Sequence, residues 1–299
     1  MGTTTFSGPV RSEKGFKQVA KNTTTGVVTD YGRMDSTKRW DRFYLEEYFK
    51  QKPALNAALD SGGTTTTNAE LTTFSIANKD FETLGTSMTT ALTTFASTSA
   101  GILMTTAGSD QDQSILLPHL DTNQSVWSGT KWGTENQVEW ECSIMLPAID
   151  NQWVWAGLKK SNVAELATDT EQAFFTFGTD ADNSGQSFDD FTKWHFVHSI
   201  GGTDYISQIP ITVAANTPYH LRIKFDSDRK VEMFLNGVQY DITTTSGSTG
   251  GTAVAAGTAK SAAITNDVNL IPYIGIEACA GAAEVLNVHY TAISRHAYE

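Results

Sequence analysis

Two glutamates at alternate positions of one predicted strand are the residues most suited to chemistry. Within residues 137–144, Glu139 and Glu141 share one face of the strand, and the apolar residues between and after them share the other. Two carboxylates about 5–5.5 Å apart on one side act as nucleophile and acid in a retaining glycosidase. The same alternation is typical of a half-buried strand with a solvated polar side, and we expect that role for both glutamates.

A short acidic loop has the first half of a calcium site. Asp180, Asp182 and Ser184 would supply oxygen ligands at positions 1, 3 and 5, followed by Gly185 at position 6. Phe191 stands at position 12, where a bidentate glutamate is required. We therefore expect a polar turn, with a bound cation as the alternative. The six histidines are scattered and predict no metal site.

Several tryptophans are candidates for stacking on sugar rings, because an aromatic face combines a large apolar surface with a defined orientation. They fall on or near predicted strands: Trp127, Trp132, Trp153, Trp155 and Trp194. The competing interpretation places them in the core. No Gly-x-Ser-x-Gly elbow or Cys/His signature is present, so we expect no catalytic residues, no cofactor and no enzymatic activity.

Short alternating strands must position all these side chains. Residues 220–225 alternate strictly, and Asn236-Gly237 favours a tight hairpin because both central residues adopt positive φ. Such strands, separated by turn signals, predict an antiparallel β-sandwich over residues 70–299. The predicted strands are 101–105, 114–117, 137–144, 152–158, 173–178, 193–200, 219–226, 230–235, 238–242, 270–278 and 284–293.

Residues 1–34 are predicted to form an extended arm, because glycine and proline interrupt the segment and no helical periodicity is visible. Residues 1–52 hold 10 Lys and Arg against 6 Asp and Glu, whereas the whole chain has a net charge of −12. A basic segment before an acidic body suggests that the segment has its own partner. The candidate docking side chains of the arm are Phe6, Val10, Arg11 and Phe16.

A short aromatic helix is predicted within residues 35–69, over residues 36–50, before Pro53 and a linker. Its aromatic side chains recur at helical spacing and are flanked by arginines, which is a composition that interface hot spots favour. The face either packs on its own domain or docks on another subunit. The residues concerned are Arg39, Trp40, Arg42, Phe43, Tyr44 and Tyr48.

The composition excludes several classes of protein. The acidic balance argues against nucleic acid as a partner, and no apolar stretch approaches the ~20 residues of a membrane span. The first residues lack the basic and apolar regions of a secretory signal. Cys142 and Cys279 cannot make a disulfide framework and are expected to be buried thiols.

Residues 218–237 read Pro-Tyr-His-Leu-Arg-Ile-Lys-Phe, a turn, then Val-Glu-Met-Phe-Leu-Asn-Gly. This segment resembles the late-strand hairpin of concanavalin-like, laminin-G-like jelly rolls. The resemblance implies a jelly roll over residues 70–299. Glycan-hydrolysing members of this fold carry a third carboxylate beside the pair. Here the flanking same-face positions hold Gln137 and Ser143, which argues against catalysis.

Three further segments are Thr-Thr-Phe-Ser-Gly-Pro-Val-Arg-Ser-Glu-Lys-Gly-Phe at residues 4–16, Gln-Ser-Ile-Leu-Leu-Pro-His-Leu-Asp-Thr-Asn-Gln-Ser-Val-Trp at residues 113–127 and Lys-Trp-Gly-Thr-Glu-Asn at residues 131–136. They resemble virion structural proteins of tailed marine bacteriophages. This resemblance implies a capsid decoration or cement protein on the virion exterior, assembled in the host cytoplasm. It would dock on the major capsid protein or another virion protein, as a homo-oligomer with a trimer favoured. The alternatives are a glycan-binding head or tail appendage that contacts the host surface, and a shell-forming capsid protein.

Overall fold

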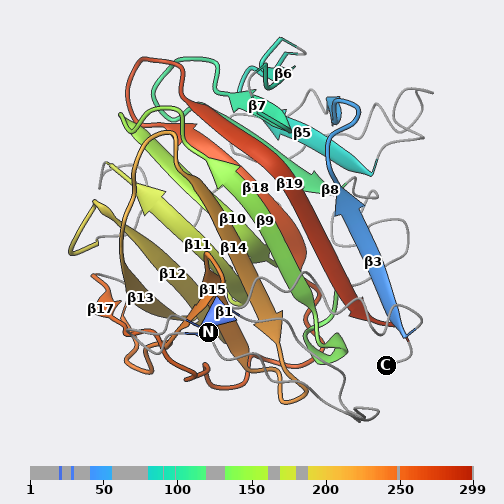
Figure 1. The fold of residues 1–299 in the computed structure, drawn as a ribbon, viewed down its shortest axis with the longest axis vertical. Helices are drawn as coiled ribbons and strands as arrows, with labels where there is room; N and C mark the ends of the chain where they lie inside the picture. The colour runs from blue at the N-terminus through green and yellow to red at the C-terminus, as the bar shows by residue number, and fades with distance from the viewer. Residues whose placement is uncertain are drawn as a thin grey trace, which may run out of the picture.

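Alternating apolar and polar side chains fold the chain into two β-sheets packed face to face (Figure 1). The computed structural model describes residues 20–21, 28–29, 41–55, 80–89, 91–97, 99–118, 132–160, 169–179, 188–247 and 250–297. The predicted antiparallel β-sandwich is confirmed. Within the described ranges, no helix is both long enough and apolar enough to cross a membrane.

Sheet A contains ten strands, in the order β1-β2-β16-β15-β14-β9-β19-β7-β6, with β3 paired to β19. In Figure 1, β3 runs beside the C-terminal half of the long β19. The strands are β1 (Ala20–Lys21), β2 (Val28–Thr29), β3 (Arg42–Glu47), β6 (Thr93–Phe95), β7 (Ile102–Thr105), β9 (Glu139–Met145), β14 (Pro218–Phe225), β15 (Val231–Leu235), β16 (Val238–Tyr240) and β19 (Val285–His296).

Sheet B contains nine strands, in the order β17-β13-β12-β11-β10-β18-β8-β5-β4. Its pairs are antiparallel except β13 with β17 and β4 with β5, which are parallel. The strands are β4 (Ala54–Leu55), β5 (Phe81–Gly85), β8 (Gln113–Pro118), β10 (Gln152–Lys159), β11 (Gln172–Gly178), β12 (Lys193–Ile200), β13 (Thr203–Thr212), β17 (Thr252–Ala253) and β18 (Ile271–Ala278). A 3-10 turn, η3 (Thr134–Asn136), precedes β9.

The main core fills the space between the sheets. Trp140 from β9 and Val154 from β10 belong to the same buried cluster, together with Trp194 and Phe196 from β12. Neighbouring residues along β10 and β12 point to the opposite side of sheet B, as the period of two requires. Both cysteines are buried, as expected, and Cys142 belongs to this core.

The predicted helix over residues 36–50 is wrong where the structure describes it, because residues 42–47 form strand β3. Aromatic side chains at 40, 44 and 48 fit a period of two as well as a helical one, so their spacing does not separate the alternatives. The segment forms a strand because the second half of β19 supplies backbone hydrogen-bond partners along its length, with Leu45 opposite Ile293. Leu45 is buried against the core, 5% exposed. Tertiary pairing here overrides local propensity.

Among the described residues before position 70, four short strands also belong to the sandwich. β1 and β2 form an antiparallel pair, and Thr29 of β2 pairs with Val238 of β16 at the edge of sheet A. β3 joins sheet A, and β4 joins sheet B beside β5. The segments that the sequence assigns to an arm and a linker therefore contribute strands to both sheets.

Candidate functional site

The turn after β3 forms one wall of a pocket. Phe49 has a φ of 54°, in the left-handed region that bulky side chains avoid. Two contacts hold it there: its side chain is 3% exposed within the main core, and its backbone N–H donates to the Glu47 carboxylate. Because Phe49 points inward, its neighbour Tyr48 lies at the surface, 40% exposed.

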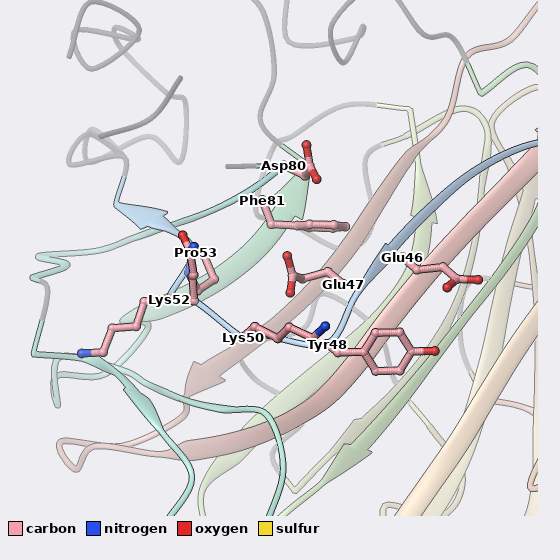
Figure 2. A pocket seen from close by; sticks show the side chains of 9 residues that line it. Glu46, Glu47, Tyr48, Lys50, Lys52, Pro53, Asp80 and Phe81 are labelled. Atoms are coloured by element: carbon pink, nitrogen blue, oxygen red, sulfur yellow. The ribbon is translucent and has the colours of Figure 1, made fainter. Parts of the chain in front are cut away.

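The pocket encloses about 300 Å³ between the end of β3 and the start of β5. Figure 2 shows the carboxylate side chains of Glu46, Glu47 and Asp80 that line it, together with the rings of Tyr48 and Phe81. Its lining residues are Glu46, Glu47, Tyr48, Lys50, Gln51, Lys52, Pro53, Asp80 and Phe81.

The carboxylates of the pocket are unevenly solvated. Burial raises the pKa of Glu47, the N–H of Phe49 lowers it, and the charge of Asp80 raises it further, so that the net pKa lies above its ordinary value. Lys50 and Lys52 supply two cations to the same pocket. The pocket thus combines hydrogen-bond acceptors, cationic donors and aromatic surface.

Tyr48 connects the pocket to a polar cluster on the outer face of sheet A. Its ring stacks on Tyr290 of β19, with centroids 5.7 Å apart and an interplanar angle of 24°. The Tyr290 hydroxyl lies 3.4 Å from Glu141 Oε1, and His220 Nε2 of β14 lies 3.6 Å from Glu141 Oε2. Ser143, two residues along β9, faces the same side.

A β-bulge brings a second histidine into this cluster. The register of β19 against β9 shifts between Val288 and Tyr290, so that His289 is an extra residue. Its Nδ1 lies 2.9 Å from Ser143 Oγ. Burial lowers the pKa of His289 below its ordinary value, which favours the neutral imidazole at pH 7.

The expectation that Glu139 and Glu141 form a solvated face is wrong, because they are 4% and 2% exposed. Glu139 accepts a hydrogen bond of 2.6 Å from Nε of Arg222 and forms an ion pair with the same guanidinium. Arg222 also lies over the ring of Phe234, 5.1 Å from its centroid. Cross-strand charge pairing therefore replaces hydration on this face.

The outer face of sheet B holds two of the predicted stacking residues, but it is covered. Trp153 and Trp155 are each 1% exposed. A Cβ at Gly178 or Gly275 would collide with these indole rings, so the glycines opposite them leave room for the rings to lie flat. Phe188 stacks on Trp153 at 5.2 Å.

The other predicted residues are dispersed. Trp132 and Trp194 lie in the main core, and Phe43 packs on Trp132 at 5.7 Å. Arg42 donates to the backbone oxygen of Gln137 and to Ser294, while Tyr44 is half-buried on β3. Outside the described residues lie Phe6, Val10, Arg11, Phe16, Arg39, Trp40, Trp127, Asp180, Asp182 and Ser184.

The described part of the chain holds no group of three or more His, Cys, Asp or Glu side chains arranged to bind a metal. Sequence reasoning missed the grouping of Ser143 with His220 and His289. The only signal for it was the shared face within each strand, because the pairing of distant strands cannot be obtained from one sequence.

No protein-family model matches the sequence, and no curated protein matches it. Among solved structures, a protein of unknown function from Shewanella oneidensis is 10% identical, with a TM-score of 0.46 and coverage of 90% of this chain and 97% of the other. Peanut lectin is 9% identical, with a TM-score of 0.43 and coverage of 85% and 97%. A glycoside hydrolase family 16 endo-glucanase from Bacteroides ovatus is 7% identical, with a TM-score of 0.48 and coverage of 83% and 99%.

These findings correct the expectation that the chain is not an enzyme. A glycoside hydrolase and a lectin both stand among the similar structures. At this distance the likeness concerns the sandwich architecture alone and gives no residue a role. The resemblance to phage virion proteins is not tested by these comparisons and stays a prediction.

Proposed function

We propose that the chain is a carbohydrate-binding β-sandwich protein, with the pocket between β3 and β5 as its glycan site. The observation that carries the proposal is the exposed ring of Tyr48 beside the carboxylates of Glu46, Glu47 and Asp80. Concave sites with a few convergent polar groups are the usual form of small-ligand sites.

The chemistry of this pocket suits a sugar ring. The C–H face of a pyranose is apolar and would stack on Tyr48, whose other face is supported by Tyr290. Sugar hydroxyls would donate to the carboxylates, and hydrogen bonds to charged acceptors are the stronger kind. Lys50 and Lys52 would donate to ring or hydroxyl oxygens.

A glycan array followed by calorimetry tests the proposal. Tyr48→Ala should weaken the affinity for the selected glycan about tenfold, equivalent to about 1.4 kcal/mol, because the stacking surface is lost. Phe43→Ala is the matched control, since Phe43 is an exposed aromatic residue of β3 that does not line the pocket. Equal affinity of wild type and Tyr48→Ala would contradict the proposal, as would an array without any bound glycan.

The virion decoration role is our second candidate. It is supported by two of the predicted docking residues, Phe43 and Tyr48, which remain 37% and 40% exposed on or just after β3. We propose that this surface contacts the capsid as part of a trimer. Locating the chain in intact particles by electron microscopy tests the position, and light scattering tests the mass. Phe43→Ala should reduce incorporation into particles without affecting glycan binding.

A further inference from the structure

Three side chains that can carry a proton lie around Ser143. His220 of β14 and Tyr290 of β19 are its direct cross-strand partners in the two ladders of β9. His289 is brought in by the bulge and contacts its hydroxyl at 2.9 Å. Ser143, His220, His289 and Tyr290 are all partly exposed. A serine and histidine within hydrogen-bond distance at an accessible position have the geometry of a nucleophile and its base.

We propose that Ser143 and His289 form a nucleophile–base pair that hydrolyses carboxylic esters. The adjoining pocket would present an O-acylated glycan as the substrate, and this choice of substrate rests on the proposed function. The assignment of Ser143 and His289 as a hydrolytic pair does not rest on it.

The reaction balances with water as the only co-reactant. Ser143 Oγ attacks the ester carbonyl carbon while its proton passes to His289 Nδ1. The carbonyl then re-forms, the C–O bond to the alcohol breaks, and His289 returns the proton to the leaving oxygen. Water adds to the acyl-serine by the same route, with His289 accepting its proton and returning it to Ser143. The products are the free acid and the alcohol.

Two further polar side chains flank the pair on the outer face of sheet A. His220 and Tyr290 lie opposite Ser143 in the two ladders, and the Tyr290 hydroxyl donates to Glu141. Glu141 lies 3.4 Å from the Tyr290 hydroxyl and 3.6 Å from His220 Nε2, so it is a positioning residue for both side chains.

The stacked rings of Tyr48 and Tyr290 connect the pocket between β3 and β5 to Ser143. Tyr48 lines the pocket and stacks on Tyr290, which flanks Ser143. A sugar held against the pocket would therefore bring its substituents toward the outer face of sheet A. Holding the ester near the serine in this way would replace a bimolecular encounter with a positioned one.

A fluorophosphonate probe, which reacts with activated serines, tests the pair on the full chain without a glycan. Peptide mass spectrometry should find the probe on Ser143 of the wild type. His289→Gln should reduce the labelling rate, and the hydrolysis rate of p-nitrophenyl acetate, by about a hundredfold or more, the usual contribution of a general base. Ser143→Ala should abolish labelling at this position.

Controls keep the outcomes distinct. Ser227→Ala changes an exposed serine in the turn after β14 and should leave labelling and hydrolysis unchanged. Circular dichroism of each variant shows whether it is folded. If folded wild type is not labelled at Ser143, or if folded His289→Gln is labelled as fast as wild type, the proposal is overturned. Labelling of Ser143 without glycan binding would support the nucleophile–base pair and contradict the carbohydrate proposal. Glycan binding without labelling of Ser143 would support the carbohydrate proposal and overturn the pair.

Discussion

At the scale of single residues, the outer face of sheet A is organised by one buried ion pair. Glu139 and Arg222 come from neighbouring strands, and their side chains are 5% and 4% exposed. Burying either charged group without the other would be unfavourable, because the loss of hydration must be offset by an opposite charge and by hydrogen bonds. The pair therefore holds the register between β9 and β14.

Arg222→Met should lower the free energy of unfolding by roughly 3–5 kcal/mol, because it leaves the Glu139 carboxylate buried without its cation. Guanidinium denaturation measures the loss. The double variant Glu139→Gln/Arg222→Met should recover part of it, and Lys160→Met at an exposed position should change stability by less than about 0.5 kcal/mol. A double variant as unstable as the single one would argue against the charge-pair explanation.

Single residues were also the scale at which the sequence was least informative. The alternation over residues 137–144 correctly separated Trp140 from Glu139 and Glu141. It could not show that the polar side is buried, because that depends on side chains from strands far away in the chain. The pairing of Ser143 with His289 joins residues 146 positions apart and depends on a bulge that leaves no local signature.

At the scale of elements, hydrophobic alternation predicted most central strands to within a few residues. The strict pattern of residues 220–225 became β14, and Asn236-Gly237 became the turn between β15 and β16. β13 was missed, because Pro210 and the buried Ser207 interrupt its pattern. β3 was predicted as a helix because its partner, the end of β19, cannot be identified from the local sequence.

The strand assignment of β3 can be tested with a cross-link. Glu46 pairs with Ala292, and directly opposite residues have Cβ atoms about 4.5–5.5 Å apart. The variant Glu46→Cys/Ala292→Cys should therefore form an intramolecular disulfide under mild oxidation, detected by mass spectrometry.

The pair Glu46→Cys/Ser294→Cys, two residues out of register, is its control and should cross-link far more slowly, because diagonal neighbours are about 7–8 Å apart. Equal rates for both pairs would contradict the register of β3 on β19.

At the scale of the whole molecule, two buried histidines make stability depend on pH. Burial lowers the pKa of His195 and of His198 from 6.5 to about 4. His195 stacks under Phe188 at 4.0 Å, and His198 stacks on Tyr205 at 4.8 Å. Between pH 6.5 and 4 the unfolded chain binds protons at these positions and the folded chain does not. Acid in this range therefore favours unfolding.

The free energy of unfolding should be unaffected by these groups above pH 6.5 and fall by about 1.4 kcal/mol per pH unit for each histidine as pH drops toward 4. Denaturant titrations at several pH values measure the slope. The double variant His195→Asn/His198→Asn removes both proton sites and should show a flatter profile. An unchanged slope in this variant would mean that other groups cause the acid sensitivity.

The position of the pocket has a mechanical consequence. Glu46 and Glu47 belong to β3 of sheet A, whereas Phe81 belongs to β5 of sheet B, so the pocket straddles the seam between the two layers. Sliding one layer over the other would distort it. A ligand bound there would consequently oppose sliding of one sheet over the other. At a free ligand concentration of a hundred times the dissociation constant, binding would add about 2.7 kcal/mol to the free energy needed to separate the two sheets.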